Sequence, residues 1–429
     1  MQSTTPKANA FTEYTPVEYL MIDIATNYGD TPMADGTTAD LDKLDFEDRI
    51  DWFKMHEKAG TLASLIDSAD NPALFFAGLL AYKDMLDDKP IGYPISLDAC
   101  SSGMQILAAF SNCEKSARRC GVVSTGHRED AYTSLFEDMQ RRHSSPLKAT
   151  RKSLKQAVMT SLYGSTAMPK KLFGDGTPEL MLYYNVIENE IPGAWELNVS
   201  LKSLWQPYEN KHSWTLPDGF DVQMDVTDVI ATDAIFNGKS VTVYTKDHVG
   251  TPTGRSLGPN IVHSVDGMIV REMYRRCSFD TAQVVKANRL CMVALNRKTR
   301  NQNTLGRGRP KDEILAKLWK MYLRTNFLSA RVIDLIDENN IGMISATALQ
   351  NLLMTLPAKR FELLAIHDCF RVHPNYGNDL RRQYNQILSE LAASDIISNI
   401  ATQITGRKMT LRKVGDISAK ILDANYTLS

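Results

Sequence analysis

Two cations and an aromatic ring lie at helical spacing in the segment 151–164. On an α-helix, Arg151 and Lys155 would be about 40° apart, and Tyr163 would lie about 80° beyond Lys155. The residues between them are good helix formers without proline, and Gly164 stands where such a helix would end. One face could therefore bind a polyphosphate through its charges and a nucleoside through the ring. The alternative is an ordinary amphipathic helix with solvated basic residues.

Two aspartates end short apolar runs on either side of this segment. Asp98 follows residues 95–97 and precedes a group of small residues, and Asp368 follows the run 361–366. Either one alone is typical of a turn or a helix cap. On neighbouring strands, however, the two carboxylates could share a pair of Mg²⁺ ions, which activate a 3′-hydroxyl and stabilise the leaving pyrophosphate. An acid pair and a phosphate-binding helix together predict a nucleotidyl-transfer site.

Four segments resemble motifs of the phage-type single-subunit RNA polymerases, which share a right-hand palm and fingers with family A DNA polymerases. The motifs occur in the family's order. They are the first catalytic motif at 98–105, the second at Arg151, Lys155, Tyr163 and Gly164, the histidine-containing segment at 259–267, and the third at 366–370, where Cys369 stands in the usual place of Ser. Flanking helices and the final residues 420–429 resemble the family as well, so the resemblance covers most of the chain from about residue 20 onward.

The resemblance implies roles for the acidic and basic residues. Asp98 and Asp368 would bind two Mg²⁺ ions, and the Ala99 carbonyl could supply another oxygen ligand. Lys155 and Arg151 would neutralise the phosphates of the incoming nucleotide as charge moves to pyrophosphate.

It also implies roles around the base pair. Tyr163 would lie against the sugar and base, and Gly164 would permit close approach of the template. His263 could touch the minor-groove side of the new base pair, and Tyr132 could pack beside the templating base. His367 could steady the primer end or be a hydrogen-bonded structural residue, and both readings stay open.

The sequence favours ribonucleotides over deoxyribonucleotides. Related DNA polymerases usually carry a Glu shortly after the first aspartate, which excludes the ribose 2′-hydroxyl. Residues 99–105 contain no acid, and Met159 stands where those enzymes usually have an aromatic residue. Tyr163 keeps a hydroxyl that can contribute to recognising a ribose.

By this resemblance the fold is expected to be α+β and mainly helical, a right-hand palm and fingers with a small antiparallel palm sheet. The expected divisions are a flexible or docking tail (1–20), a helical segment packed on the palm (21–90), palm with the first motif (91–110), fingers (111–259), a return between palm and fingers (260–276), an insertion (277–357), and palm with the third motif and C-terminal end (358–429).

Residues 226–246 predict a β-hairpin, because Asn237-Gly238 separates two β-rich runs. The hairpin falls where promoter-reading family members have their specificity hairpin. A DNA contact and an ordinary structural hairpin both stay open.

Composition limits how the chain could bind nucleic acid. The formal net charge of the 429 residues is −1, so binding would depend on local basic clusters rather than on a global positive field. Candidate clusters are 148–155 and 296–311, the second read as a mobile basic loop; solvated charge runs are the alternative.

The six cysteines lack metal-ligand spacing, which argues against zinc and for reduced thiols. No apolar run is long enough to span a membrane, and no signal peptide is evident. We expect a cytoplasmic enzyme, in the host cytoplasm if the protein is viral.

The predicted function is DNA-dependent RNA synthesis, with DNA template, RNA product and ribonucleoside triphosphates as partners. Only 97 residues precede Asp98, and the family's short Gly-Arg motif is not found among them. We therefore expect a catalytic subunit whose smaller protein partner supplies the N-terminal and thumb parts. A family A-like DNA polymerase fragment and a non-catalytic nucleic-acid-binding subunit are the alternatives.

Overall fold

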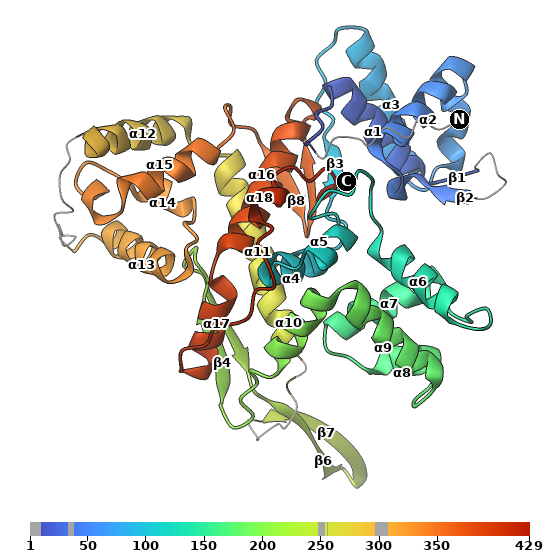
Figure 1. The fold of residues 1–429 in the computed structure, drawn as a ribbon, viewed down its shortest axis with the longest axis vertical. Coiled ribbons are helices and arrows are strands. Elements are labelled where there is room, and N and C mark those ends of the chain that lie inside the picture. The colour runs from blue at the N-terminus through green and yellow to red at the C-terminus, as the bar shows by residue number, and fades with distance from the viewer. Residues whose placement is uncertain (1–9, 33–37, 248–253, 255, 297–307) are drawn as a thin grey trace.

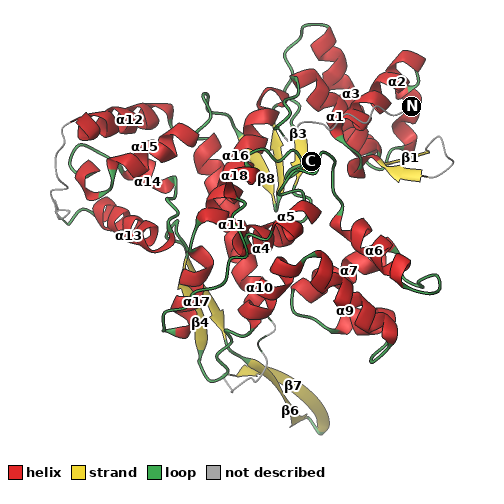
Figure 2. Ribbon diagram, in the orientation of Figure 1, coloured by secondary structure: helices red, strands yellow, loops and turns green. Residues whose placement is uncertain are grey.

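The computed structural model describes residues 10–32, 38–247, 254, 256–296 and 308–429. These residues form a mainly helical protein with small antiparallel sheets, which confirms the expected fold class at that level (Figures 1 and 2). Most of the predicted basic loop 296–311 lies outside the described residues.

The described N-terminal part consists of three α-helices with two short strands and two 3-10 segments between them. Its elements are α1 (Pro16–Tyr28), β1 (Asp30–Pro32), β2 (Thr38–Asp40), the 3-10 turn η1 (Leu41–Lys43), α2 (Phe46–Ala59), the 3-10 helix η2 (Leu62–Ser68) and α3 (Pro72–Leu86).

The boundary of the predicted tail at residue 20 is wrong. Thr15 caps α1 in a capping box with Glu18, and Pro16 occupies its first turn, so a helix begins inside the expected tail. Tyr14, Tyr19 and Leu20 are all buried in the core. Residues 1–9 of that tail lie outside the described part.

A three-stranded antiparallel sheet carries both predicted catalytic aspartates. Its strands are β3 (Ile95–Asp98), β8 (Leu363–Ile366) and β9 (Cys369–Val372), in the order β3-β9-β8. Ile95, Leu97, Phe370 and Val372 are buried, so alternate residues of β3 and β9 face the core. Helices α4 (Ser102–Ser111), α11 (Leu257–Cys277) and α16 (Gly377–Ala393) contact one another beside this sheet (Figure 1).

A group of helices follows α4 in the chain and contains the cationic helix as predicted. The group comprises α5 (Glu114–Arg119), α6 (Ala131–Arg142), α7 (Arg151–Leu162), α8 (Ala167–Phe173), α9 (Pro178–Glu190) and α10 (Pro192–Lys202). Thr150 caps α7 through Ser153, and Leu154, Ala157 and Val158 bury its inner face.

Two β-hairpins come next. The first pairs β4 (Lys211–Thr215) with β5 (Asp221–Asp225), and the second pairs β6 (Asp228–Phe236) with β7 (Lys239–Asp247). Asn237 and Gly238 both have positive φ, +50° and +71°, as a two-residue hairpin turn requires. The predicted hairpin at 226–246 is therefore confirmed as a structure, and it runs out from the body of the protein (Figure 2).

Residues 277–357 contain helices with a hydrophobic core of their own. They are α12 (Thr281–Asn296), α13 (Pro310–Thr325), α14 (Arg331–Leu335), the turn η3 (Ile341–Met343) and α15 (Ala346–Thr355). A buried ion cluster ties this unit to α11 and α16: Glu272 accepts from the Ala330 N–H at 2.9 Å, and Arg276 pairs with Glu272 and Glu390.

The chain ends with η4 (Pro374–Tyr376), which precedes α16, and then α17 (Ile396–Thr405) and α18 (Ser418–Ile421). The last residue returns to the sheet, where the Ser429 N–H donates to the Asp98 carbonyl at 2.9 Å.

Candidate active site

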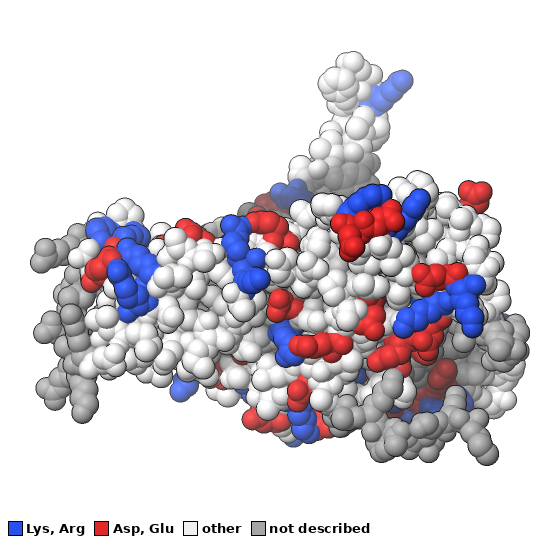
Figure 3. All heavy atoms as spheres, turned by 90° about the horizontal axis from the view of Figure 1, so that it is seen from above, with Lys and Arg blue, Asp and Glu red and all other residues white. Residues whose placement is uncertain are grey.

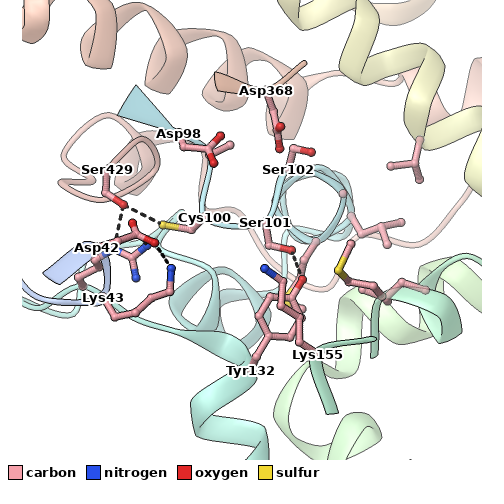
Figure 4. Close-up of a pocket in the computed structure, with 18 of the residues that line it drawn as sticks. Asp42, Lys43, Asp98, Cys100, Ser101, Ser102, Tyr132, Lys155, Asp368 and Ser429 are labelled. Atoms are coloured by element: carbon pink, nitrogen blue, oxygen red, sulfur yellow. Dashed lines mark hydrogen bonds and ion pairs between the residues drawn. The ribbon is translucent and has the colours of Figure 1, made fainter. Parts of the chain in front are cut away.

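A cavity of about 270 Å³ lies beside the end of β3 and the β8–β9 turn of the three-stranded sheet. Its walls come from η1, from the segment 98–104, and from α6, α7, α11, the β8–β9 turn and the chain end. Segments far apart in the sequence therefore meet at one place (Figure 4).

The strand register brings the two predicted catalytic aspartates to this cavity. Asp98 is the last residue of β3 and lies opposite Cys369 on β9. The Ala99 N–H donates to the Asp368 carbonyl at 3.3 Å, which holds the β3 end against the β8–β9 turn. Both carboxylates line the cavity, on the same side in Figure 4. Asp98 therefore ends β3, and Asp368 lies in the turn that precedes the neighbouring strand β9.

The turn that presents Asp368 has an unusual backbone. His367, which precedes it, has φ of +57°, in the left-handed region that non-glycine residues seldom adopt. His367 is exposed and does not line the cavity.

Negative charge accumulates around Asp98. Burial, the nearby Asp368 and then Asp42 raise the pKa of Asp98 to about 6. Burial and Asp368 likewise raise the pKa of Asp266, a residue of α11, to about 6. A group of crowded carboxylates is a place where a bound cation would be strongly favoured.

Cations line other walls of the cavity. Lys155 on α7 lies with its Nζ 5.5 Å from the centroid of the Tyr132 ring, and Lys43 on η1 contacts Asp42. In Figure 4 both lysines are on the side away from Asp98 and Asp368. Arg128 is buried within the wall, and its Nε donates to the Ser429 Oγ at 2.9 Å.

Arg151 lies beside this cavity rather than in its wall. It lines a smaller adjoining cavity together with Lys155. Its Nε donates to Asp130 Oδ2 at 2.9 Å and to Thr133 Oγ1 at 2.8 Å. Burial alone would raise the pKa of Asp130, but Arg151 lowers it below its ordinary value. Arg151 and Lys155 thus lie on one helix and line the same small cavity. Arg151, however, forms an ion pair with Asp130, the N-cap residue of α6.

Aromatic residues occupy a third side. Tyr163, which caps α7, lines the cavity, and its ring meets the exposed His263 ring edge-on with centroids 5.1 Å apart. A Cβ added at Gly103 would lie 3.9 Å from the Tyr163 hydroxyl, so that hydroxyl faces the start of α4. The Tyr132 hydroxyl lies 3.0 Å from Ser101 Oγ.

Gly164 follows Tyr163 as a buried residue with φ of +83°, which a side chain would disfavour. The glycine is therefore required by the turn that ends α7, and it does not line the cavity itself.

The structure therefore gathers six predicted residues around one cavity: Asp98, Ala99, Asp368, Lys155, Tyr163 and Tyr132. Arg151, His263, Gly164 and His367 do not line this cavity. Sequence reasoning did not single out Asp42, Lys43 or Arg128, which also line the cavity. The segment 40–43 has no motif of its own; only its Asp-x-Asp-Lys charge pattern could have drawn notice.

The donors present fit Mg²⁺. Among the described residues, no three His, Cys, Asp or Glu side chains are grouped so as to hold a metal ion. Two oxygen-donor carboxylates facing a cavity are nevertheless the protein contribution typical of Mg²⁺ sites, where water and substrate phosphates complete the coordination. Asp98 and Asp368 would hold the ions, and Ala99 lines the same wall.

The N-terminal part of the chain is similar to a known protein family. Residues 13–173 match the DNA-dependent RNA polymerase family. The matched region, less than half of the 429 residues, includes Asp98, Tyr132, Lys155 and Tyr163, whereas Asp368 and His263 lie beyond it. No curated protein matches the chain. The matched family is one of nucleotidyltransferases, and the match covers only this part of the chain.

Charge on the surface is mixed. On the face in Figure 3, Lys and Arg side chains alternate with Asp and Glu and form no continuous basic band. Among the residues that the structure describes, no helix has both the length and the apolar character needed to cross a bilayer.

Proposed function

We propose that the chain is the catalytic subunit of a DNA-dependent RNA polymerase, and that it adds ribonucleotides to the 3′ end of RNA at the cavity between β3 and α7. The observation that carries the proposal is the arrangement of that cavity. Two carboxylates lie on one side, lysines lie on the other, and an aromatic residue bearing a hydroxyl lies between helices α7 and α4.

Each side of the cavity has a role in this reaction. The Asp98 and Asp368 carboxylates would hold two Mg²⁺ ions, which supply Lewis-acid activation of the 3′-hydroxyl and charge stabilisation at the leaving pyrophosphate. Lys155 and Lys43 reach the cavity from separate elements and would bind the triphosphate, with Arg151 beside them. Their positive charge balances the charge that develops on pyrophosphate.

Preference for a ribose follows from the wall beside Tyr163. The segment 99–105 has no acidic side chain, and Gly103 leaves room beside the Tyr163 hydroxyl. Met159 lines the cavity one turn before Tyr163 and narrows it less than an aromatic ring would. These residues can admit a 2′-hydroxyl, and the tyrosine can hydrogen-bond to it. These features favour an RNA polymerase over a DNA polymerase fragment.

The palm and fingers assignment belongs to the same proposal. The three-stranded sheet with Asp98 and Asp368 corresponds to the palm, and α6 to α10 correspond to the fingers. A smaller protein subunit is proposed to supply the promoter-binding and thumb parts, with the assembled enzyme acting in the cytoplasm of an infected cell if it is viral.

A primed DNA template tests the proposal. The purified chain, alone and with the candidate smaller subunit, is given Mg²⁺ and either ribo- or deoxyribonucleoside triphosphates. We expect extension with ribonucleotides that depends on the second subunit. Extension with deoxyribonucleotides would favour the DNA polymerase alternative, full activity of the chain alone would refute the split enzyme, and template binding without extension would favour a non-catalytic subunit.

A further inference from the structure

The β6–β7 hairpin is a long two-stranded ribbon whose described side chains are all exposed. Each strand has nine residues, so the ribbon extends for about 30 Å. Among the residues that the structure describes, no other strand pairs with it, so the outer edge of β7 is open to pairing. An isolated ribbon of this kind is marginally stable in water, and a free edge without proline or glycine invites pairing.

One face of the ribbon has apolar residues in its middle and charged residues near its ends. The register pairs Thr232 with Val243 and Ala234 with Val241, so alternate residues of both strands share this face. Phe236, Val241 and Val243 are 71%, 46% and 44% exposed. Such a face is costly to leave in water.

The charges of the ribbon disfavour nucleic acid as its partner. Residues 228–247 contain three Asp and two Lys, with no Arg. Binding to a phosphate backbone depends on an excess of basic side chains, which this ribbon lacks. A partner with apolar and balanced charged groups fits it better.

The sequence of β7 is complementary to itself. If two copies pair antiparallel about Val243, the central valines face each other and Val241 faces Thr245 of the other copy. Lys239 then lies opposite Asp247 at both ends, so each pair of charges is opposite in sign. Asp247 also has a partner within its own chain, and its two oxygens can accept from both.

The backbone hydrogen bonds agree with this register. In a two-residue hairpin the pair closing the turn, Phe236 and Lys239, is hydrogen-bonded, and bonding alternates along the strands from there. The outward-facing N–H and C=O groups of β7 therefore belong to residues 240, 242, 244 and 246. Pairing about Val243 joins 242 with 244 of the other copy and 240 with 246, so these groups all find partners.

The outer edge of β6 is less suitable for pairing with a second copy. Pairing of β6 with itself about Thr232 would bring the two Asp233 carboxylates to diagonal positions, where like charges repel.

We propose that the chain forms a symmetric homodimer through β7, in which the two hairpins make a four-stranded antiparallel sheet. The interface is isologous, as expected for a twofold dimer, and it does not depend on the proposed catalytic activity.

Sedimentation equilibrium of the full-length chain tests the dimer directly. Because two paired strands bury a small area, we expect a weak dimer with a dissociation constant of about 1–100 µM. Lys239→Asp and Val243→Lys should each weaken the dimer by about tenfold or more. Lys239→Asp places two acids opposite each other at both ends, and Val243→Lys places two lysines opposite each other on the twofold axis. Lys239→Asp combined with Asp247→Lys should restore dimerisation.

Lys246→Asp is the matched control, because it changes the charge of β7 equally but faces Ser240 of the other copy. We expect it to leave the dimer intact. A wild-type chain that stays monomeric at about 100 µM, or a dimer indifferent to Lys239→Asp and Val243→Lys, would overturn the proposal. If the wild type is monomeric and both Lys239→Asp and Lys246→Asp weaken DNA binding, the ribbon binds nucleic acid instead.

Discussion

At the scale of single residues, Asp98 is a carboxylate of the cavity whose pKa is raised by its surroundings. Burial and neighbouring acids raise its pKa to about 6, so its protonation and Mg²⁺ binding compete close to neutral pH. We expect the Mg²⁺ concentration for half-maximal nucleotide addition to rise as pH falls from about 7.5 to about 5.5. Replacement by Asn would leave only a neutral amide oxygen and remove the charge that favours the ion. A Mg²⁺ requirement that does not change over this range would contradict the raised pKa.

The same shift predicts a stability effect in the absence of metal. A carboxyl whose pKa is higher in the folded than in the unfolded state binds more protons when folded. Its contribution to stability is therefore lost as pH rises from the unfolded value of about 4 to about 6. Asp98→Asn should unfold at a slightly higher temperature than the wild type at pH 7.5 in EDTA, and the two should converge near pH 4.

Tyr163 offers a test of sugar recognition. Its hydroxyl faces Gly103 at the start of α4, so Tyr163→Phe removes a polar group from the wall of the cavity without changing the ring or its contact with His263. We expect the preference for ribo- over deoxyribonucleotides to fall about tenfold, because one hydrogen bond to the 2′-hydroxyl is lost. The measurement is kcat/KM for both nucleotides. An unchanged ratio with equal losses for both would show that the hydroxyl has only a structural role.

At the scale of elements, the local features were predictable and the contacts between them were not. Helix α7, the strand end at Asp98 and the Asn237-Gly238 turn follow from propensity and turn chemistry within a few residues. Lys43 and Arg128 come to the cavity only through tertiary packing, as does the pairing of Arg151 with Asp130. Thr15 and Glu18 have the spacing of a capping box, and this pattern places the start of a helix inside the expected tail.

Asp130 combines two roles that can be separated. Its Oδ1 accepts from the Tyr132 and Thr133 N–H groups at the start of α6, and its Oδ2 pairs with Arg151. Asp130→Asn should keep the cap but lose the charge, whereas Asp130→Ala should lose both and cost about 1 kcal/mol of stability.

If Asp130 orients Arg151 toward the triphosphate, both variants should raise the KM for nucleotides severalfold, while only the alanine variant should lower the unfolding temperature. A KM that rises in the alanine variant alone would assign Asp130 to capping only. Steady-state kinetics and thermal unfolding of the same preparations separate these outcomes.

At the scale of the whole molecule, two hydrophobic cores are joined by buried charges. Glu272 on α11 contacts Arg275 and Arg276 and accepts from the Ala330 N–H of the 277–357 unit. Glu272→Ala leaves Arg276 partly unpaired and should destabilise the protein by about 3–5 kcal/mol, whereas Glu272→Gln, which keeps the N–H contact, should cost less. Urea unfolding measures both, and equal stability of all three proteins would show that the cluster does not join the cores.

The most direct test of the account is primer extension by Asp98→Asn and Asp368→Asn, each assembled with the same partner as the wild type. Asp84→Asn, an exposed change on α3, is the control. If both aspartates hold Mg²⁺, each variant should lose about 10³-fold or more in ribonucleotide addition, with folding unchanged and the control fully active. Ribonucleotide addition by either variant at the wild-type rate would contradict the assignment of this cavity as the polymerase active site.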